Sequence, residues 1–69
     1  MNKKVVIIGA GDLGRQFLHL ITNYTEDSVI GWYDDTLEKG IIIEGVEVKG
    51  SITDIELDRE FYDEVAIAI

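Results

Sequence analysis

The chain has 69 residues, of which 46% are hydrophobic and 29% charged, a composition that predicts one small globular domain. Fourteen acidic residues against six basic ones give a net charge of −8, which argues against nucleic acid and anionic membranes as partners because both need a basic surface. The sequence has no cysteine for disulfides or thiolate metal sites, and its apolar runs fall short of the roughly 18 residues of a membrane span. We therefore expect a cytoplasmic protein without membrane insertion.

The most informative segment lies near the N-terminus. Residues 3–8 end in a continuous β-branched apolar run, which predicts a buried parallel strand. Gly9, Gly11 and Gly14 follow it with the spacing G-x-G-x-x-G. The first glycine of this spacing permits a tight turn, the second lets the backbone approach a ligand, and the third lets helix and strand pack closely. The pattern is typical of a turn that holds nucleotide phosphates, and a turn that serves packing alone is the alternative.

A helix and a second strand are predicted next. Leu13, Phe17, Leu20, Ile21 and Tyr24 recur at the spacing of one helix face. Residues 28–33 then form another apolar run, so the two strands and their helix predict a right-handed βαβ unit.

Two carboxylates follow the second strand. Asp34 and Asp35 come about 20 residues after the last glycine, where a dinucleotide fold has the carboxylate that accepts a hydrogen bond from a ribose hydroxyl. Capping of the following turn is the alternative role. Of the two aromatic residues before them, we expect Trp32 to enter the core, which leaves Tyr33 free to stack on a base.

The remaining residues predict shorter elements. Turn signals at residues 39–40 and 44–45 flank two short apolar stretches, a pattern typical of a hairpin. Residues 51–54 resemble a capping box, residues 56–64 form an acidic stretch that we interpret as solvated surface, and residues 65–69 predict a third core strand. The fold class is therefore a small Rossmann-like α/β domain with an open, mainly parallel sheet of at least three parallel strands. Because buried parallel strands need cover on both faces, we expect the chain to be truncated after this core strand.

These segments, taken in order, resemble a known family. The succession of residues 5–11, Gly14-Arg15, residues 29–35, residues 45–54 and residues 65–69 is similar to the N-terminal domain of bacterial sugar O- and N-acyltransferases of the PglD/NeuD type. The resemblance covers essentially the whole chain. It implies that residues 1–69 form one domain that recognises a UDP- or CMP-linked sugar.

The resemblance also implies what this chain lacks. In the family a left-handed β-helix follows this domain, builds a homotrimer, binds acetyl-CoA as co-substrate and carries the catalytic histidine. We therefore predict no catalytic residue, no cofactor and no metal site in these 69 residues. The only histidine, His19, falls on the polar helix face away from the glycine turn.

The predicted substrate-binding residues are Gly9, Gly11, Asp12, Leu13, Gly14, Asp34 and Asp35. Asp12 and Leu13 depart from the family, whose members often have a small residue and then histidine there, and the Asp12 carboxylate would repel a diphosphate. The predicted function is nucleotide-sugar recognition for a sugar acetyltransferase of surface polysaccharide or glycan biosynthesis. The alternatives are an NAD-binding half-domain of an oxidoreductase or nucleotide-sugar dehydratase, and a non-catalytic assembly domain.

Overall fold

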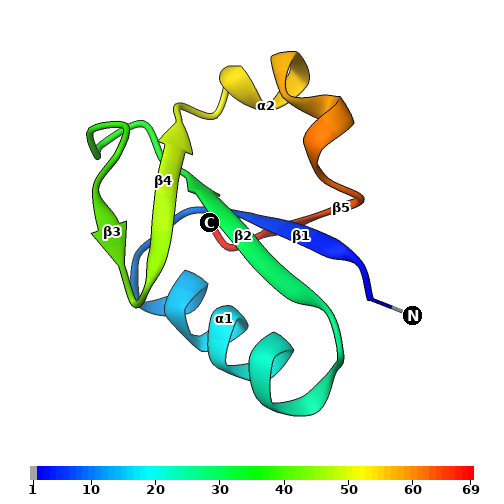
Figure 1. Cartoon of the computed structure of the whole chain (residues 1–69). Coiled ribbons are helices and arrows are strands. Elements are labelled where there is room, and N and C mark those ends of the chain that lie inside the picture. The colour runs from blue at the N-terminus through cyan, green and yellow to red at the C-terminus, as the bar shows by residue number, and fades with distance from the viewer. Residues whose placement is uncertain (1) are drawn as a thin grey trace.

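The computed structural model describes residues 2–69, which form three layers with one sheet in the middle (Figure 1). In chain order the elements are β1 (Lys4–Ile8), α1 (Asp12–Tyr24), β2 (Ser28–Tyr33), β3 (Ile42–Ile43), β4 (Val46–Gly50), α2 (Asp54–Leu57), the 3₁₀ helix η1 (Arg59–Phe61) and β5 (Glu64–Ile67). Helix α1 covers one face of the sheet, and α2 with η1 lies over the other. Among residues 2–69 no helix has the length and apolarity to cross a membrane.

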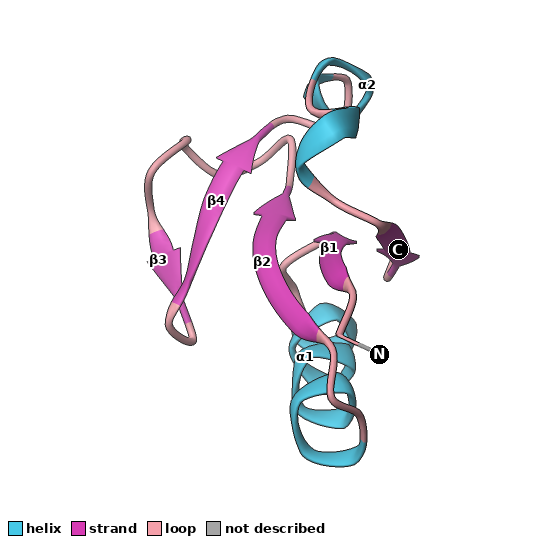
Figure 2. Ribbon diagram, turned by 45° about the vertical axis from the view of Figure 1, so that its right-hand side comes forward, coloured by secondary structure: helices cyan, strands magenta, loops and turns pink. Residues whose placement is uncertain are grey.

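The strand order is β3-β4-β2-β1-β5, and all pairs are parallel except β3 with β4 (Figure 2). The small Rossmann-like α/β fold with a mainly parallel sheet is therefore confirmed, as are the hairpin and the third parallel strand. The structure adds that β4 joins β2 in parallel, which extends the sheet beyond the predicted hairpin. Strand β1 has β2 on one side and β5 on the other, so the topological switch point lies between β1 and β5.

The core on the α1 side is built around Trp32. Its side chain is fully buried with Ile7, Leu18 and Val48, because apolar positions of three strands and the helix converge there. Its indole Nε1 donates to the carbonyl oxygen of Ile43 at 3.1 Å, which satisfies the only polar atom of the side chain.

Tyr33 is buried as well, on the opposite face of the sheet. It is 2% exposed and packs with Val6, Ile8 and side chains from the segment around α2. Its hydroxyl donates to Asp58 Oδ2 at 2.6 Å, and burial together with this bond raises the pKa of Tyr33. The expectation that Tyr33 is free to stack on a base was wrong, because its side chain points to the face opposite Trp32 and is buried there under residues of the segment around α2.

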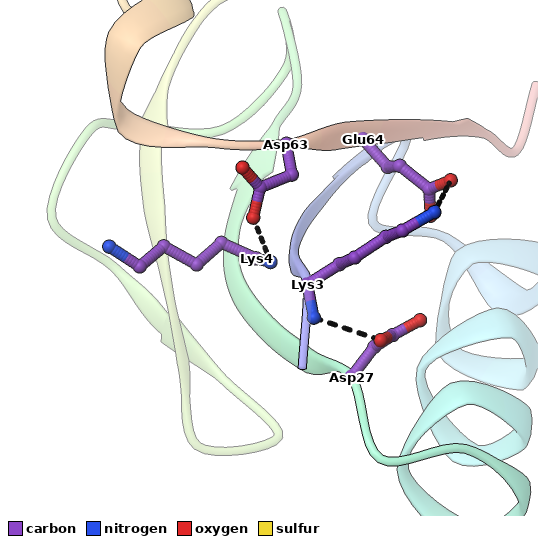
Figure 3. A network of polar contacts seen from close by, with 5 residues as sticks. All are labelled: Lys3, Lys4, Asp27, Asp63 and Glu64. Carbon is purple, nitrogen blue, oxygen red and sulfur yellow. Dashed lines mark hydrogen bonds and ion pairs between the residues drawn. The ribbon is translucent and has the colours of Figure 1, made fainter. Parts of the chain in front are cut away.

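At the amino edge of the sheet, acidic side chains just before β2 and at the start of β5 bond to the residues that lead into β1 (Figure 3). The backbone N–H of Lys3 donates to Asp27 Oδ1 at 2.9 Å, and the backbone N–H of Lys4 donates to Asp63 Oδ2 at 2.8 Å. The Lys3 ammonium lies 3.1 Å from Glu64 Oε2, a contact that raises the pKa of Lys3. These contacts hold the first residues of β1 between its two neighbouring strands.

Candidate functional site

The carboxyl ends of the parallel strands meet at one edge of the sheet. Backbone hydrogen bonds join them: Ala68 N–H to the Ile8 carbonyl at 2.9 Å, Gly9 N–H to the Tyr33 carbonyl at 2.9 Å, and Asp34 N–H to the Gly50 carbonyl at 3.0 Å. Open α/β sheets bind ligands at this edge, at the switch point. A cavity of about 270 Å³ lies there, lined by Gly9, Asp34, Asp35, Thr36, Ile52, Ala68 and Ile69.

The glycine turn has different steric demands at its three glycines. Gly9 has φ = +96°, and a Cβ there would lie 2.7 Å from the carbonyl oxygen of Ala68. A Cβ at Gly14 would collide with the carbonyl oxygen of Gly9, so α1 packs directly on the turn. Gly11 has open space where its Cβ would stand. Gly9 and Gly14 therefore perform the turn and packing roles of the motif, and Gly11 leaves room for an approaching group.

Helix α1 begins beside the turn without a side-chain cap. Gly11 is the N-cap residue, and the first helical hydrogen bond runs from Arg15 N–H to the Gly11 carbonyl at 3.0 Å. The N–H groups of Asp12, Leu13 and Gly14 precede this bond and belong to the positive end of the helix dipole. These three residues and Gly11 do not belong to the cavity lining, so their contact with a substrate stays a prediction.

The Asp34 side chain links the glycine turn to the end of β2 through hydrogen bonds. Its Oδ2 accepts from the N–H of Ala10 at 2.9 Å, and its Oδ1 accepts from the N–H and the hydroxyl of Thr36 at 2.8 and 2.6 Å. These bonds lower the pKa of the Asp34 carboxyl group from its ordinary value of 3.8, and the bond from Ala10 has the largest effect. The predicted turn-capping alternative is thus realised at Asp34, and three of its roughly four acceptor positions are in use.

Asp35 is the more available carboxylate. It is exposed, and its Oδ1 accepts from the N–H of Ile52 at 2.8 Å, which ties the loop after β4 to the end of β2. Within residues 2–69 its second oxygen has no hydrogen-bond partner. Asp35 can therefore accept a bond from a hydroxyl or base N–H of a molecule in the cavity.

Sequence reasoning missed four lining residues. Ala68 and Ile69 follow β5, and their position could have been inferred from the rule that parallel strands share a carboxyl edge. Thr36 and Ile52 lie in loops whose course the sequence does not indicate.

The lining offers carboxylates, a hydroxyl and apolar groups, which can accept hydrogen bonds from a ligand and contact its apolar parts. His19 lies elsewhere on the surface, with its Nε2 3.7 Å from Glu44 Oε1. In the described part of the chain no three histidine, aspartate or glutamate side chains gather as metal ligands would.

The comparison with protein families agrees with this geometry. The family model described as the PglD N-terminal domain matches residues 4–69. No curated protein and no solved structure gives a significant match. The matched residues include the glycine turn, both carboxylates and every strand of the sheet. The chain therefore belongs to the PglD N-terminal domain family, the N-terminal domain of PglD/NeuD-type sugar acetyltransferases.

Proposed function

We propose that the chain is the nucleotide-sugar recognition domain of a bacterial sugar acetyltransferase and that the cavity at the switch point binds the nucleotide. The observation that carries this proposal is the meeting of Gly9, the first glycine of the turn, with Asp34 and Asp35 around one cavity of about 270 Å³. Ligand cavities for whole small molecules start at about 300 Å³, so this one suits the nucleoside, with the remainder of the ligand outside.

Polar chemistry supports a nucleoside as the bound group. The free oxygen of Asp35 and the remaining acceptor position of Asp34 can take hydrogen bonds from ribose hydroxyls or a pyrimidine N–H. The diphosphate would lie toward the start of α1, whose N–H groups favour an anion. Asp12 in the first turn opposes that attraction and weakens binding.

The remaining steps are proposed for the whole enzyme and rest on the family. A histidine of a following β-helix domain would take a proton from the sugar amine or hydroxyl, which then attacks the thioester carbon of acetyl-CoA. The new N–C or O–C bond replaces the C–S bond, and coenzyme A leaves as the thiol. The present chain would hold the sugar nucleotide in position, in a cytoplasmic homotrimer that acts in polysaccharide or glycan biosynthesis.

NAD binding has weaker support. A dinucleotide fold also uses the carboxylate after the second strand to hold a ribose, so Asp34 and Asp35 suit both ligands, and the match to the PglD N-terminal domain favours the sugar nucleotide. An assembly domain without a ligand remains the other alternative, since Asp12 disfavours phosphate.

A titration tests the proposal. The ¹⁵N-labelled chain is titrated with UDP, UDP-N-acetylglucosamine, CMP and NAD, and amide shifts are mapped. We expect saturable shifts at Gly9, Asp35 and Ile52 with UDP or CMP and none with NAD. Asp35→Asn keeps one acceptor for Ile52 but removes the charge, and it should weaken binding at least about threefold, whereas the exposed Glu38→Gln should not. A preference for NAD would favour the dehydrogenase alternative, and silence from all four ligands with the spectrum intact would favour the assembly domain.

A further inference from the structure

A larger cavity, of about 460 Å³, lies on the sheet face that is opposite to α1. Val6 of β1 and Ile30 of β2 line its apolar part, and residues of η1 and the segment before β5 line another side. It shares no lining residue with the switch-point cavity. Its size falls within the range of about 300–1,000 Å³ found for small-molecule sites.

Lysines converge on this cavity. Lys4, Lys39 and Lys49 line it, and they are three of the four lysines in a chain whose net charge is −8. Lys4 belongs to β1, Lys39 to the loop before β3, and Lys49 to β4, so the fold and not the local sequence brings them together. In an acidic protein this gathering gives one cavity a basic lining, and ammonium groups there can pair with an anion.

Few acidic groups offset these three charges. Asp58 is the one carboxylate in the lining, and its Oδ2 accepts the hydroxyl hydrogen of Tyr33. Lys49 Nζ lies 3.1 Å from Glu47 Oε1. The Lys4 side chain extends away from Asp63, which bonds only its backbone nitrogen (Figure 3). The lining thus holds three lysines and one engaged carboxylate, and a neighbouring glutamate pairs with one of these lysines.

Aromatic rings complete the cavity. Tyr33 is buried, Tyr62 is held by a hydrogen bond from its hydroxyl to the carbonyl oxygen of Ile55 at 2.8 Å, and Phe61 is 60% exposed. Fixed rings favour a flat apolar partner, and an exposed phenylalanine beside a cavity offers surface that such a partner would bury.

We propose that this cavity is a second binding site, for a small aromatic molecule that carries a phosphate or carboxylate group. The ring packs against Ile30, Phe61 and Tyr62, and the anionic group lies between the ammonium groups of Lys39 and Lys49. The site is independent of the nucleotide cavity and of the function proposed for it.

The test uses 1-naphthyl phosphate as the probe and maps amide shifts of the ¹⁵N-labelled chain. We expect saturable shifts at Val6, Ile30 and Phe61, with weaker binding of both 1-naphthol and inorganic phosphate, because each lacks one half of the ligand. Shifts confined to Gly9 and Asp35, no saturable binding, or equal affinity for either half alone would overturn the proposal.

Matched variants separate the local charge from the overall charge. Lys39→Met and Lys49→Met keep the apolar stem and should each weaken binding about fivefold, the effect expected for one partly exposed charge. Lys3→Met makes the same change in net charge at the fourth lysine, which pairs with Glu64 outside the cavity, and should change the affinity less than twofold. Equal weakening by all three variants, with intact spectra, would overturn the assignment of the anion to this cavity.

Discussion

Replacement of Asp34 tests how the glycine turn is held. Asp34→Ala removes three hydrogen bonds and leaves the N–H of Ala10, a residue only 3% exposed, without its charged acceptor. That bond contributes about 1–2 kcal/mol, whereas the two exposed bonds from Thr36 together add about 0.5 kcal/mol, since water competes for them. We expect the free energy of unfolding to fall by about 2 kcal/mol, a large fraction of the stability of so small a domain.

Urea unfolding at neutral pH measures this loss. Trp32 is the only tryptophan and is fully buried, so its fluorescence reports the folded core directly. Glu38→Ala removes an exposed carboxylate a few residues away and serves as the matched control. A loss below about 0.5 kcal/mol for Asp34→Ala, or one equal to that of the control, would refute this account of the turn.

The lowered pKa of Asp34 also predicts how the stability of the protein depends on pH. The carboxyl pKa of Asp34 is lower in the folded state than its ordinary value of 3.8, so the stabilisation is complete above that value and is lost as the pH falls through the folded-state pKa. The stability difference between the wild type and Asp34→Ala should therefore shrink as the pH is lowered from about 5 through 3.8 and below. A constant difference over this range would contradict the role of the charge.

Three further predictions concern other parts of the chain. Gly14→Ala should cost about 2 kcal/mol or more in urea unfolding because its Cβ would strike the turn. Gly11→Ala has open space for its Cβ and loses only a good N-cap residue, so it should cost less than about 1 kcal/mol. Similar losses for the two variants would contradict the packing role of Gly14. Because folding raises the pKa of Tyr33, its hydroxyl should stay protonated at about pH 11 in the folded protein. Tyr33→Phe should therefore leave the phenolate absorbance of the folded protein at that pH unchanged. A lower absorbance in the variant would refute this prediction. Asp12→Asn should strengthen UDP binding about threefold in calorimetry by removing a like charge near the diphosphate; unchanged affinity would separate Asp12 from the ligand.

Local patterns explain why most of the fold could be predicted. The apolar runs before Gly9 and Asp34 have the composition of buried strands, and the helix between them has a clear apolar face. The position of β4 beside β2 could not be predicted in this way, because a hairpin pattern determines only how β3 and β4 pair with each other. Which side of the sheet receives the hairpin depends on contacts between distant residues.

The acidic stretch shows the same limit. The interpretation of residues 56–64 as solvated surface agrees with the exposure of Asp63 and Glu64, but it did not predict that three carboxylates of this stretch bond to distant residues. Asp58 accepts the Tyr33 hydroxyl, Asp63 accepts the Lys4 N–H, and Glu64 pairs with Lys3. These partners lie 25 to 61 residues away in the sequence, so no local sequence pattern predicts these contacts. The lysines of the second cavity escaped prediction for the same reason.

The central position of β1 has a consequence for how the chain folds. Strand β1 pairs with β5, Val6 opposite Val65, so this part of the sheet forms only through contacts of high sequence separation. Such contacts raise the contact order and slow folding, because the loop-closure entropy is lost before they stabilise the chain. During synthesis β1, α1 and β2 can assemble first, but the switch-point cavity includes Ala68 and Ile69. The cavity therefore forms only after β5 has paired with β1.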